Sequence, residues 1–470
     1  MQQWSRRRFL AAAATATLGV AGGGCGSASQ SRPVGPAARE VAAAEARRRR
    51  PGAPVREVTL TAAPATIDLA GRAVTAWAYN HTVPGPLLRV RVGEVLRAQL
   101  ENRLPEPTSI HWHGIVVRND MDGVPGVTQP PVAADGRFVY EFTVPDAGTY
   151  FFHPHVGLQL DRGLYAVLVV DDPAEPGGYD QEAVVVLDDW TLGVGPTPEQ
   201  LQERLMAQGG MMGSDMGMMG QGGGSSALGG TGGQIAYPRY LLNGRPPADP
   251  PTIRARPGQR LRLRVINAAA ETAFRVALGG HRLTVTHTDG LPVTPVTADA
   301  LLLGMGERCD ALVRLHDGAF PLVALAEGKS GQALGVIRTG RGAPPPADAH
   351  PGELGGRLAA MAELGPDPQW ALPTAQPDRT HQLLLSGGMM SAQWTINGRA
   401  FEDAEPLPVK AGERIRLVFG NQSMMFHPMH LHGHSFQVRH PAGPGPRKDT
   451  VIVRPMQQLA VDVAADNPGQ

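Results

Sequence analysis

One short pattern occurs three times along the chain and limits the folds that it can adopt. Each copy has a turn at an asparagine, a short strand, a Gly-Glu or Gly-Gln turn, and a second strand of alternating character. The asparagines are Asn80, Asn243 and Asn397, so the copies begin 163 and 154 residues apart. This period is far longer than the unit of a solenoid, so each copy marks one domain of a tandem array.

Strand-like alternation dominates the remaining sequence, as in Val139–Val144 and Leu261–Val265. Helical periodicity is confined to short candidates at Pro198–Met206 and near Leu354–Leu364. The 470 residues include 59 Gly and 43 Pro, which suit the frequent turns of an all-β protein. The sequence therefore predicts an all-β chain of three β-sandwich or Greek-key domains.

The N-terminus has the features of an export signal. A basic start at Ser5–Leu10 precedes an apolar run at Ala11–Ala21, which is typical of the twin-arginine route. The run is shorter than the roughly 20 apolar residues of a membrane-spanning helix. Cys25 follows it, where bacterial lipoproteins carry a lipidated cysteine, and simple cleavage is the alternative. We expect residues 1–28 to be the signal and residues 29–54 to be a disordered tether.

Charge and cysteine content exclude several classes of function. The chain carries 43 Lys+Arg and 43 Asp+Glu, so no net field attracts nucleic acid or an anionic membrane surface. Two cysteines are too few for a disulfide framework or for a thiolate-rich zinc or iron–sulfur site. The 15 histidines are the main resource for metal chemistry, and more than half of them lie in three short motifs.

The spacing of these histidine motifs suits metal binding. They are His111-Trp-His-Gly, His153-Pro-His and His427-Pro-Met-His-Leu-His-Gly-His. Residues i and i+2 of a strand project from the same face, so each pair aims two imidazoles at one point. The motifs belong to the first and third repeats and are absent from the second. Because neutral imidazole binds Cu, Zn, Fe and Ni, residue type alone predicts a metal cluster without identifying the metal.

The three motifs, in this order and spacing, resemble those of three-domain multicopper oxidases, from the Thr59 region to the C-terminus. The sequence is especially similar to exported bacterial members that oxidise cuprous ion. The resemblance implies three tandem cupredoxin-like Greek-key domains, the third incomplete. It also implies copper as cofactor, in type 1, type 2 and binuclear type 3 centres with four Cu in a complete protein. We further expect O2 as the electron acceptor and a monomeric protein.

The resemblance also assigns roles to individual side chains. Grouped by centre, the implied ligands are His111 and His430 for type 2 copper, His113 and His153 for one type 3 copper, His155 and His432 for the other, and His427 for type 1 copper. His434 belongs to the motif but is expected to pack or to form a hydrogen bond to its surroundings. Asp122 resembles the acid that assists proton delivery to bound oxygen, and an ordinary turn residue before glycine is the alternative.

The chain departs from the family pattern at one point. That pattern requires a closing His-Cys-His motif, whose thiolate makes the type 1 site, and this sequence has none. Cys309 has no histidine neighbour and is expected to be a small buried residue. Asn80 precedes His153 by 73 residues in the first repeat. Asn397 precedes Gln470 by the same number in the third. We therefore expect the missing motif just beyond Gln470, and the chain as given to be C-terminally incomplete and inactive.

Shifts in composition give the expected domain boundaries. The domains are expected at residues 55–175, 176–342 and 378–470, with a Pro-rich linker at 343–377. A Met- and Gly-rich insertion at 206–233 interrupts the second domain and carries six methionines. Thioethers are soft ligands that select Cu(I), so the insertion favours transient Cu(I) binding. A low-complexity loop without function is the alternative.

For the complete protein we expect a multicopper oxidase that couples one-electron oxidation of a reductant to the four-electron reduction of O2 to water. The expected reductant is Cu(I), which would make the role copper tolerance in the periplasm or cell envelope after twin-arginine export. Membrane attachment through a lipidated Cys25 stays open. The alternatives are a laccase-like oxidase of small phenols or other metal ions, and a copper-binding cupredoxin protein without turnover.

Overall fold

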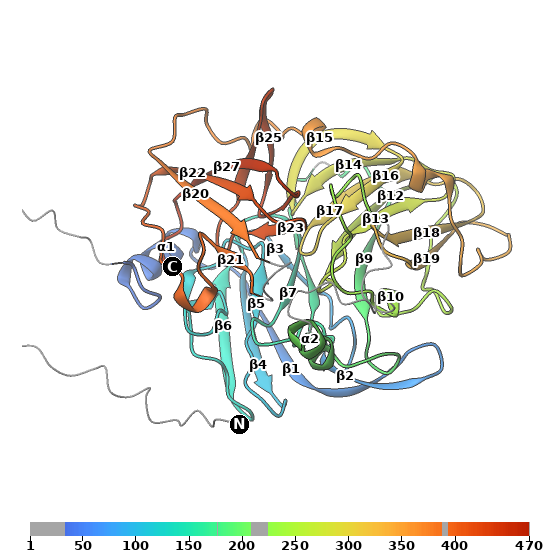
Figure 1. Ribbon diagram of the computed structural model, residues 1–470, viewed down its shortest axis with the longest axis horizontal. Helices are drawn as coiled ribbons and strands as arrows, with labels where there is room; N and C mark the ends of the chain where they lie inside the picture. The colour runs from blue at the N-terminus through green and yellow to red at the C-terminus, as the bar shows by residue number, and fades with distance from the viewer. Residues whose placement is uncertain (1–32, 176, 208–223, 388–392, 470) are drawn as a thin grey trace, which may run out of the picture. The chain divides into compact units, whose positions relative to one another are not determined.

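The computed structural model describes residues 33–175, 177–207, 224–387 and 393–469. From Val34 onward the chain forms one compact unit. The described strands make six sheets, which pair into three sandwiches coloured blue to cyan, green to gold, and orange to red along the chain (Figure 1). The predicted export signal, with Cys25, and residues 208–223 of the Met-rich insertion lie outside the described residues.

The first sandwich (residues 55–171) packs two four-stranded sheets, ordered β2-β1-β4-β6 and β3-β8-β7-β5. β1 runs parallel to β4, and β3 parallel to β8, so the connections cross over as in a Greek key. Apolar side chains from every strand fill the space between the sheets. The strands are β1 (Val55–Asp68), β2 (Ala73–Tyr79), β3 (Leu88–Arg91), β4 (Val95–Asn102), β5 (His111–His113), β6 (Arg137–Thr143), β7 (Gly148–His153) and β8 (Ala166–Asp171).

The second sandwich (residues 181–338) is the largest. Its sheets are ordered β10-β9-β12-β17-β14-β15 and β11-β19-β18-β13-β16, around a continuous apolar core. The strands are β9 (Gln181–Trp190), β10 (Arg239–Leu242), β11 (Thr252–Arg254), β12 (Arg260–Asn267), β13 (Phe274–Leu278), β14 (Leu283–Thr288), β15 (Leu291–Ala298), β16 (Ala300–Leu303), β17 (Arg308–Arg314), β18 (Ala319–Ala326) and β19 (Gln332–Arg338).

The third sandwich (residues 379–464) pairs a six-stranded sheet, ordered β21-β20-β22-β27-β24-β25, with the two-stranded sheet β23-β26. Its core is smaller than those of the other two sandwiches. The strands are β20 (Arg379–Ser386), β21 (Thr395–Ile396), β22 (Arg414–Asn421), β23 (His427–His430), β24 (Phe436–His440), β25 (Gly443–Lys448), β26 (Thr450–Val453) and β27 (Gln458–Ala464). The prediction of an all-β, cupredoxin-like architecture is confirmed.

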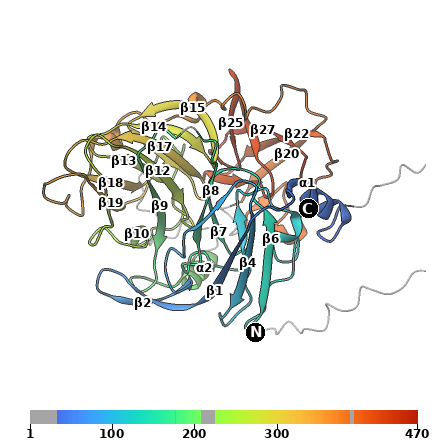
Figure 2. The same ribbon diagram turned by 180° about the vertical axis from the view of Figure 1, so that it is seen from behind.

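Helices are few, and one of them corrects an expectation. Residues 29–54 are not a disordered tether throughout, because α1 occupies Arg39–Arg48. Its sequence is rich in Ala, Glu and Arg, which favour helix, and arginines lie in its last turn, where the helix dipole favours cations. The buried carboxylate of Glu45 accepts hydrogen bonds from the Thr143 backbone N–H and hydroxyl at 2.8 and 2.7 Å, which docks α1 beside β6 (Figure 2).

Of the two helices predicted from the sequence, one is confirmed and one is wrong. The candidate at Pro198–Met206 is confirmed as α2, Pro198–Ala207. The candidate near Leu354–Leu364 is wrong, since only the short 3₁₀ turns Gly352–Gly355 and Met361–Glu363 form there. Further 3₁₀ turns are Asn119–Met121 and Phe401–Asp403. None of the helices in the described part of the chain is long and apolar enough to cross a membrane.

The repeated asparagine has the same structural role in each sandwich. Asn80, Asn243 and Asn397 all adopt the left-handed conformation, with φ of 51°, 51° and 54°. Each side chain accepts a hydrogen bond, at 2.7 to 2.8 Å, from a backbone N–H of the first strand of its own sandwich (β1, β9 or β20). It also donates, at 3.0 Å, to the carbonyl oxygen two residues before that N–H. Asparagine both tolerates this conformation and can bond in this way, which explains why it recurs.

Candidate metal centre

Strand pairing in the first sandwich brings the first two histidine motifs together. β5 lies antiparallel to β7, with His111 opposite His153. His111 and His113 project from one face of β5 and are buried, whereas Trp112 projects from the other face into the core. The alternation of the strand therefore separates the two histidines from the tryptophan between them.

The third motif reaches the same place from the far end of the chain. His430, the last residue of β23, stacks on His113 with 3.7 Å between ring centroids and 15° between ring planes. His432 lies over His111, with centroids 3.9 Å apart. The first and third sandwiches thus meet through histidine rings.

Six imidazoles form this group, called here the histidine cluster: His111, His113, His153, His155, His430 and His432. Two sets of three have one nitrogen per ring within 4.8 Å of the other two, and His111 belongs to both sets. One set adds His155 and His432, and the other adds His113 and His430. The Nε2 atom of His153 lies 3.4 Å from Nδ1 of His113. This arrangement provides donors for more than one metal ion.

The surrounding protein engages Nδ1 of four rings of the histidine cluster, and in two of these, His111 and His430, it leaves Nε2 without a partner. His111 directs Nδ1 to Asp122, and His430 directs Nδ1 to the carbonyl oxygen of Asp449 at 2.9 Å. His153 directs Nδ1 to a backbone carbonyl at 3.0 Å. The Nε2 atoms of His111 and His430 are buried without a hydrogen-bond partner. Metal-binding histidines use one nitrogen for the metal and the other for a carbonyl or carboxylate, so this donor set fits copper.

Asp122 lies between two rings of the histidine cluster that come from different sandwiches. Its Oδ1 is 3.2 Å from Nδ1 of His111, and its Oδ2 is 2.9 Å from Nδ1 of His432. Burial alone would raise the pKa of this carboxyl, but the contacts with His111 and His432 hold the pKa well below its usual range. Gly123 follows with φ of +78°, and a Cβ there would lie 1.8 Å from a backbone oxygen. Asp122 is therefore a turn residue that also accepts from the rings.

Two residues that the sequence analysis missed complete the surroundings. Thr450 begins β26, and its Oγ1 lies 3.1 Å from a ring nitrogen of both His113 and His430. Asp449 precedes it and is buried against Arg308 of the second sandwich. Burial alone would raise the pKa of Asp449, but the Arg308 guanidinium holds it well below its usual range. The sequence does carry a signal, because polar Lys448–Thr450 leads directly into an apolar strand, where buried charges need partners.

Burial keeps the imidazoles neutral. Together with the neighbouring His432 ring, it lowers the pKa of His111 to about 4. Burial is also the first cause of the lowered pKa values of His113, His153 and His430. A neutral imidazole has a free lone pair, so at pH 7 these rings are in the protonation state that binds a metal ion.

His427 lies apart from the histidine cluster. Its Nε2 is 2.8 Å from the Ser423 hydroxyl, and its ring meets Trp394 edge-on with 4.8 Å between centroids. Cys309 is the one cysteine that the structure describes, and it is buried in β17, where burial raises the pKa of its thiol. Within the described residues, the surroundings of His427 thus supply one imidazole and no thiolate for type 1 copper. His434 accepts a hydrogen bond from the backbone N–H of Asn467 at 3.3 Å.

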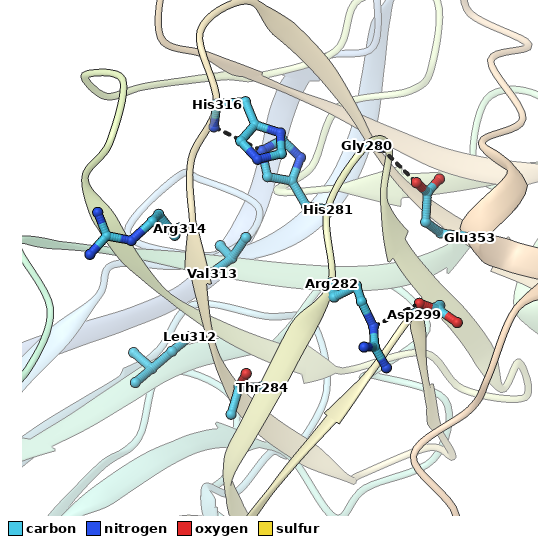
Figure 3. Close-up of a pocket in the computed structure, with 10 residues that line it drawn as sticks. All are labelled: Gly280, His281, Arg282, Thr284, Asp299, Leu312, Val313, Arg314, His316 and Glu353. Atoms are coloured by element: carbon cyan, nitrogen blue, oxygen red, sulfur yellow. Dashed lines mark hydrogen bonds and ion pairs between the residues drawn. The ribbon is translucent and has the colours of Figure 1, made fainter.

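A cavity of about 490 Å³ opens in the second sandwich, and none of the clustered histidines lines it. Figure 3 shows His281 stacked on His316, and the side chain of Arg282 directed to Asp299. Nδ1 of His281 lies 2.8 Å from the carbonyl oxygen of Gly279, and its Nε2 accepts from the His316 backbone N–H at 3.0 Å. Since both ring nitrogens of His281 are engaged, this cavity offers no comparable donor set.

The described end of the Met-rich insertion lies against the third sandwich. Leu228 is fully buried and packs with Ala273 and with Phe426, the residue that precedes His427. Ser225, at the same end, donates a hydrogen bond to Glu327. The insertion therefore returns to the fold next to the beginning of β23.

The chain matches the family described as multicopper oxidase over residues 61–175, 181–342 and 373–470. It is 48% identical over 485 residues to multicopper oxidase MmcO of Mycobacterium tuberculosis, covering 100% of this chain and 93% of that protein. It is 29% identical over 538 residues to copper resistance protein A of Escherichia coli, covering 87% and 88%.

Solved structures of multicopper oxidases are also similar to this chain. The multicopper oxidase from Pseudomonas thermotolerans is 28% identical, with a TM-score of 0.67, over 89% of this chain and 94% of that one. The laccase from Botrytis aclada is 25% identical, with a TM-score of 0.69, over 89% and 84%. Fet3p, described as a multicopper oxidase that functions in iron import, aligns with a TM-score of 0.73 over 88% and 86%. At 20% identity, that last likeness concerns the fold alone.

Proposed function

Because this chain belongs to the multicopper oxidase family, we propose that the protein, with a thiolate to complete its type 1 site, oxidises Cu(I) and reduces O2 to water and so provides copper tolerance. In this reaction four Cu(I) substrate ions each lose one electron, and O2 takes up four electrons and four protons to give two water molecules. Family membership gives the oxidase class and the copper cofactors. The choice of Cu(I) as the reductant is ours.

The observation that carries the proposal is the histidine cluster, whose buried Nε2 atoms of His111 and His430 have no partner in the protein. Grouped by centre, the proposed ligands are His111 and His430 for type 2 copper, His113 with His153 and His155 with His432 for the two type 3 ions, and His427 for type 1 copper. Bound copper supplies one-electron redox chemistry and O2 binding, which side chains alone do not provide.

The polypeptide itself positions these rings and manages protons. Asp122 keeps the Nδ1 sides of His111 and His432 engaged, so that their Nε2 atoms face inward. We also assign to Asp122 proton delivery to the oxygen being reduced, because it lies at the edge of the histidine cluster and this step consumes protons. The buried faces of His111 and His113 keep bulk water away from the reduction of O2.

Two observations support Cu(I) as the reductant. One relative is named for copper resistance and is covered over 88% of its length. Leu228, within the described part of the Met-rich insertion, also packs on Phe426, the residue before His427. Soft thioethers carried to that point would concentrate Cu(I) beside the proposed electron-accepting side of the third sandwich. Export by the twin-arginine route to the periplasm or cell envelope is part of the same proposal.

Two other functions have an observation in their favour. The structural likeness to a laccase favours a small phenol as reductant. The lack of a thiolate beside His427, within the described residues, favours a copper-binding protein without turnover.

Oxygen uptake with Cu(I) as the sole reductant distinguishes these functions. A copper-loaded oxidase should consume one O2 for every four Cu(I) oxidised. Copper binding at the histidine cluster without oxygen uptake would support the non-catalytic function, and uptake with a phenol but not with Cu(I) would support the laccase-like one.

A second assay tests the role of the insertion. Replacing Met211, Met212, Met216, Met218 and Met219 with leucine keeps apolar bulk and removes the soft sulfur atoms. The variant should show a raised KM for Cu(I) with kcat nearly unchanged, because uniform binding is lost. Its KM for a phenol should not change. An equal rise for both substrates would refute the thioether argument.

A further inference from the structure

One arginine of the second sandwich touches all three sandwiches. Arg308 begins β17 and is completely buried. Its Nη1 and Nη2 donate to Oδ1 and Oδ2 of Asp449 at 2.7 and 2.6 Å, in the third sandwich. Its Nε donates to the carbonyl oxygen of Thr149 at 3.1 Å, in the first, and Nη1 also donates to that of Gly306. This two-point pairing fixes the plane of the Asp449 carboxylate.

The carboxylate in turn orients the neighbouring hydroxyl. Thr450 donates its O–H to Oδ1 of Asp449 at 2.8 Å. Once this proton is committed, the Thr450 oxygen can act only as an acceptor. It lies 3.1 Å from Nε2 of His113 and 3.1 Å from Nδ1 of His430. Both of those ring nitrogens must therefore carry the proton of the neutral ring.

The opposite nitrogens then have free lone pairs. These are Nδ1 of His113, which faces His153, and Nε2 of His430, which is buried without a partner. A histidine with the other tautomer would present an N–H to the centre of the histidine cluster and could not bind a metal ion there. The chain of donors thus selects the tautomer that metal binding requires.

Two glycines allow the backbone to pass close to the Arg308–Asp449 ion pair and to His113. Gly114 has φ of +88°, and a Cβ there would lie 2.2 Å from Nη2 of Arg308 and 2.5 Å from Oδ2 of Asp449. Gly306 has φ of +80°, and a Cβ there would lie 2.8 Å from Cε1 of His113. The glycine that closes the first histidine motif is thus needed for the ion pair to reach its place.

We propose that Arg308 is a positioning residue for the copper cluster, which acts through Asp449 and Thr450 to set the ring tautomers of His113 and His430. The inference rests on the proposed function for its purpose, because a tautomer matters only if these rings bind copper. The second sandwich supplies none of the proposed ligands. It contributes to the centre through Arg308 and through Asp289, whose Oδ2 accepts from the backbone N–H groups of Asp449 and Thr450 at 3.3 and 3.1 Å.

The first test uses the metal-free full-length chain with ¹⁵N-labelled histidine. In NMR spectra, protonated and unprotonated ring nitrogens resonate in separate ranges, so tautomers can be read for each ring. Wild type should show protonated Nε2 for His113 and protonated Nδ1 for His430. Thr450→Val, which removes the acceptor of His113, should show a mixed or reversed tautomer at His113. His430 should keep its tautomer, because the Asp449 carbonyl oxygen still accepts from its Nδ1. Thr450→Ser should restore the wild-type pattern at His113.

The second test measures Cu(II) binding by equilibrium dialysis. Arg308→Lys keeps a positive charge but loses the two-point geometry, so copper should bind about tenfold more weakly, as for other changes to the partners of metal-binding histidines. Thr450→Val should have a similar effect. Arg262→Lys is the matched control, because Arg262 is also buried and donates twice to Asp310 without touching the clustered rings. It should bind copper like wild type.

The possible results distinguish a failure of this inference from a failure of the proposed function. An unchanged His113 tautomer in Thr450→Val, or wild-type copper affinity in Arg308→Lys, would overturn the inference. A wild-type protein with the expected tautomers that takes up no copper would refute the proposed function instead. If Thr450→Val does not fold, Arg308→Lys decides by both readouts. If both variants lose the fold as judged by circular dichroism, the ion pair is a folding element only and the inference fails.

Discussion

Oδ2 of Asp122 lies 2.9 Å from Nδ1 of His432, although 310 residues separate the two along the chain. The same carboxylate lies 3.2 Å from Nδ1 of His111, in its own sandwich. One acid therefore holds one ring from the first sandwich and one from the third in a fixed relation. Neither sandwich contains the histidine cluster by itself.

Replacing Asp122 with asparagine should loosen both rings. An amide has one acceptor oxygen where the carboxylate has two, so one of the two Nδ1 atoms would face an N–H group. Copper binding should weaken about 10- to 100-fold, as measured by equilibrium dialysis. Asp120→Asn is the control, because Asp120 pairs with Arg118. Equal weakening in the two variants would mean that the turn, and not the contact with the rings, matters.

Trp112 should be a major source of stability for the first sandwich. Its ring is fully buried among Tyr140, Phe142 and Phe152, with centroid distances of 5.8, 5.2 and 5.0 Å. Trp112→Ala should lower the free energy of unfolding by about 3–5 kcal/mol in urea denaturation. Phe401→Ala should change it by less than about 0.5 kcal/mol, because Phe401 is 73% exposed. A small effect at Trp112 would show that the core closes over the gap.

The buried acid Asp161 should contribute to a loss of stability as the pH rises toward 8. Burial, together with the nearby Asp189 charge, raises the pKa of Asp161 to about 8, and its Oδ1 has no hydrogen-bond partner. Between about pH 4 and pH 8 the folded state therefore holds a proton that the unfolded chain releases, so stability decreases through this window.

The variant Asp161→Asn should escape that loss. The decrease in unfolding free energy from pH 5 to pH 8 should be smaller in the variant than in wild type by on the order of 3 kcal/mol. Asp135→Asn, at an exposed turn, should follow wild type. Parallel wild-type and Asp161→Asn profiles would show that Asp161 ionises freely in the fold.

The docking of α1 should depend on Glu45. The Glu45→Ala variant loses two charge-assisted hydrogen bonds to Thr143, so α1 should open more often. Trypsin should then cleave at Arg47–Arg50 about tenfold faster in a time course read by mass spectrometry. Glu40→Ala removes an exposed acid that contacts Arg39 and should cleave like wild type. Equal rates in the two variants would place the anchor of α1 elsewhere, for instance at buried Val41.

Local regularities were predictable from the sequence. The repeated asparagine needs a left-handed turn, so its recurrence marks equivalent hairpins at Asn80, Asn243 and Asn397. The i, i+2 spacing placed His111 and His113 on one face of a strand, and β5 has that geometry. A further repeat was missed. Asn102 and Asn267 are buried at equivalent strand ends, and each accepts from the backbone N–H two residues later.

Contacts between distant parts of the chain were not predictable in this way. Arg308 and Asp449 are 141 residues apart. The sequence around Asp449 indicates a buried charge, but nothing local identifies Arg308 as its partner. α1 was missed for a similar reason, because its composition resembles that of a solvated charged tether. Its docking depends on the hydrogen bond that Glu45 accepts from Thr143, 98 residues away. Helix propensity favours α1, but a contact with a distant residue fixes it against the first sandwich.

The wide sequence separation of the clustered rings also sets an order of events during maturation. Contacts between residues far apart form only after the intervening loops have closed, so the rings at positions 111 and 432 meet late in folding. A nascent chain that has folded its first sandwich presents four of the six imidazoles and lacks the two that complete both triads. Copper would then bind last, after the first and third sandwiches have docked, and its binding would stabilise the docked arrangement.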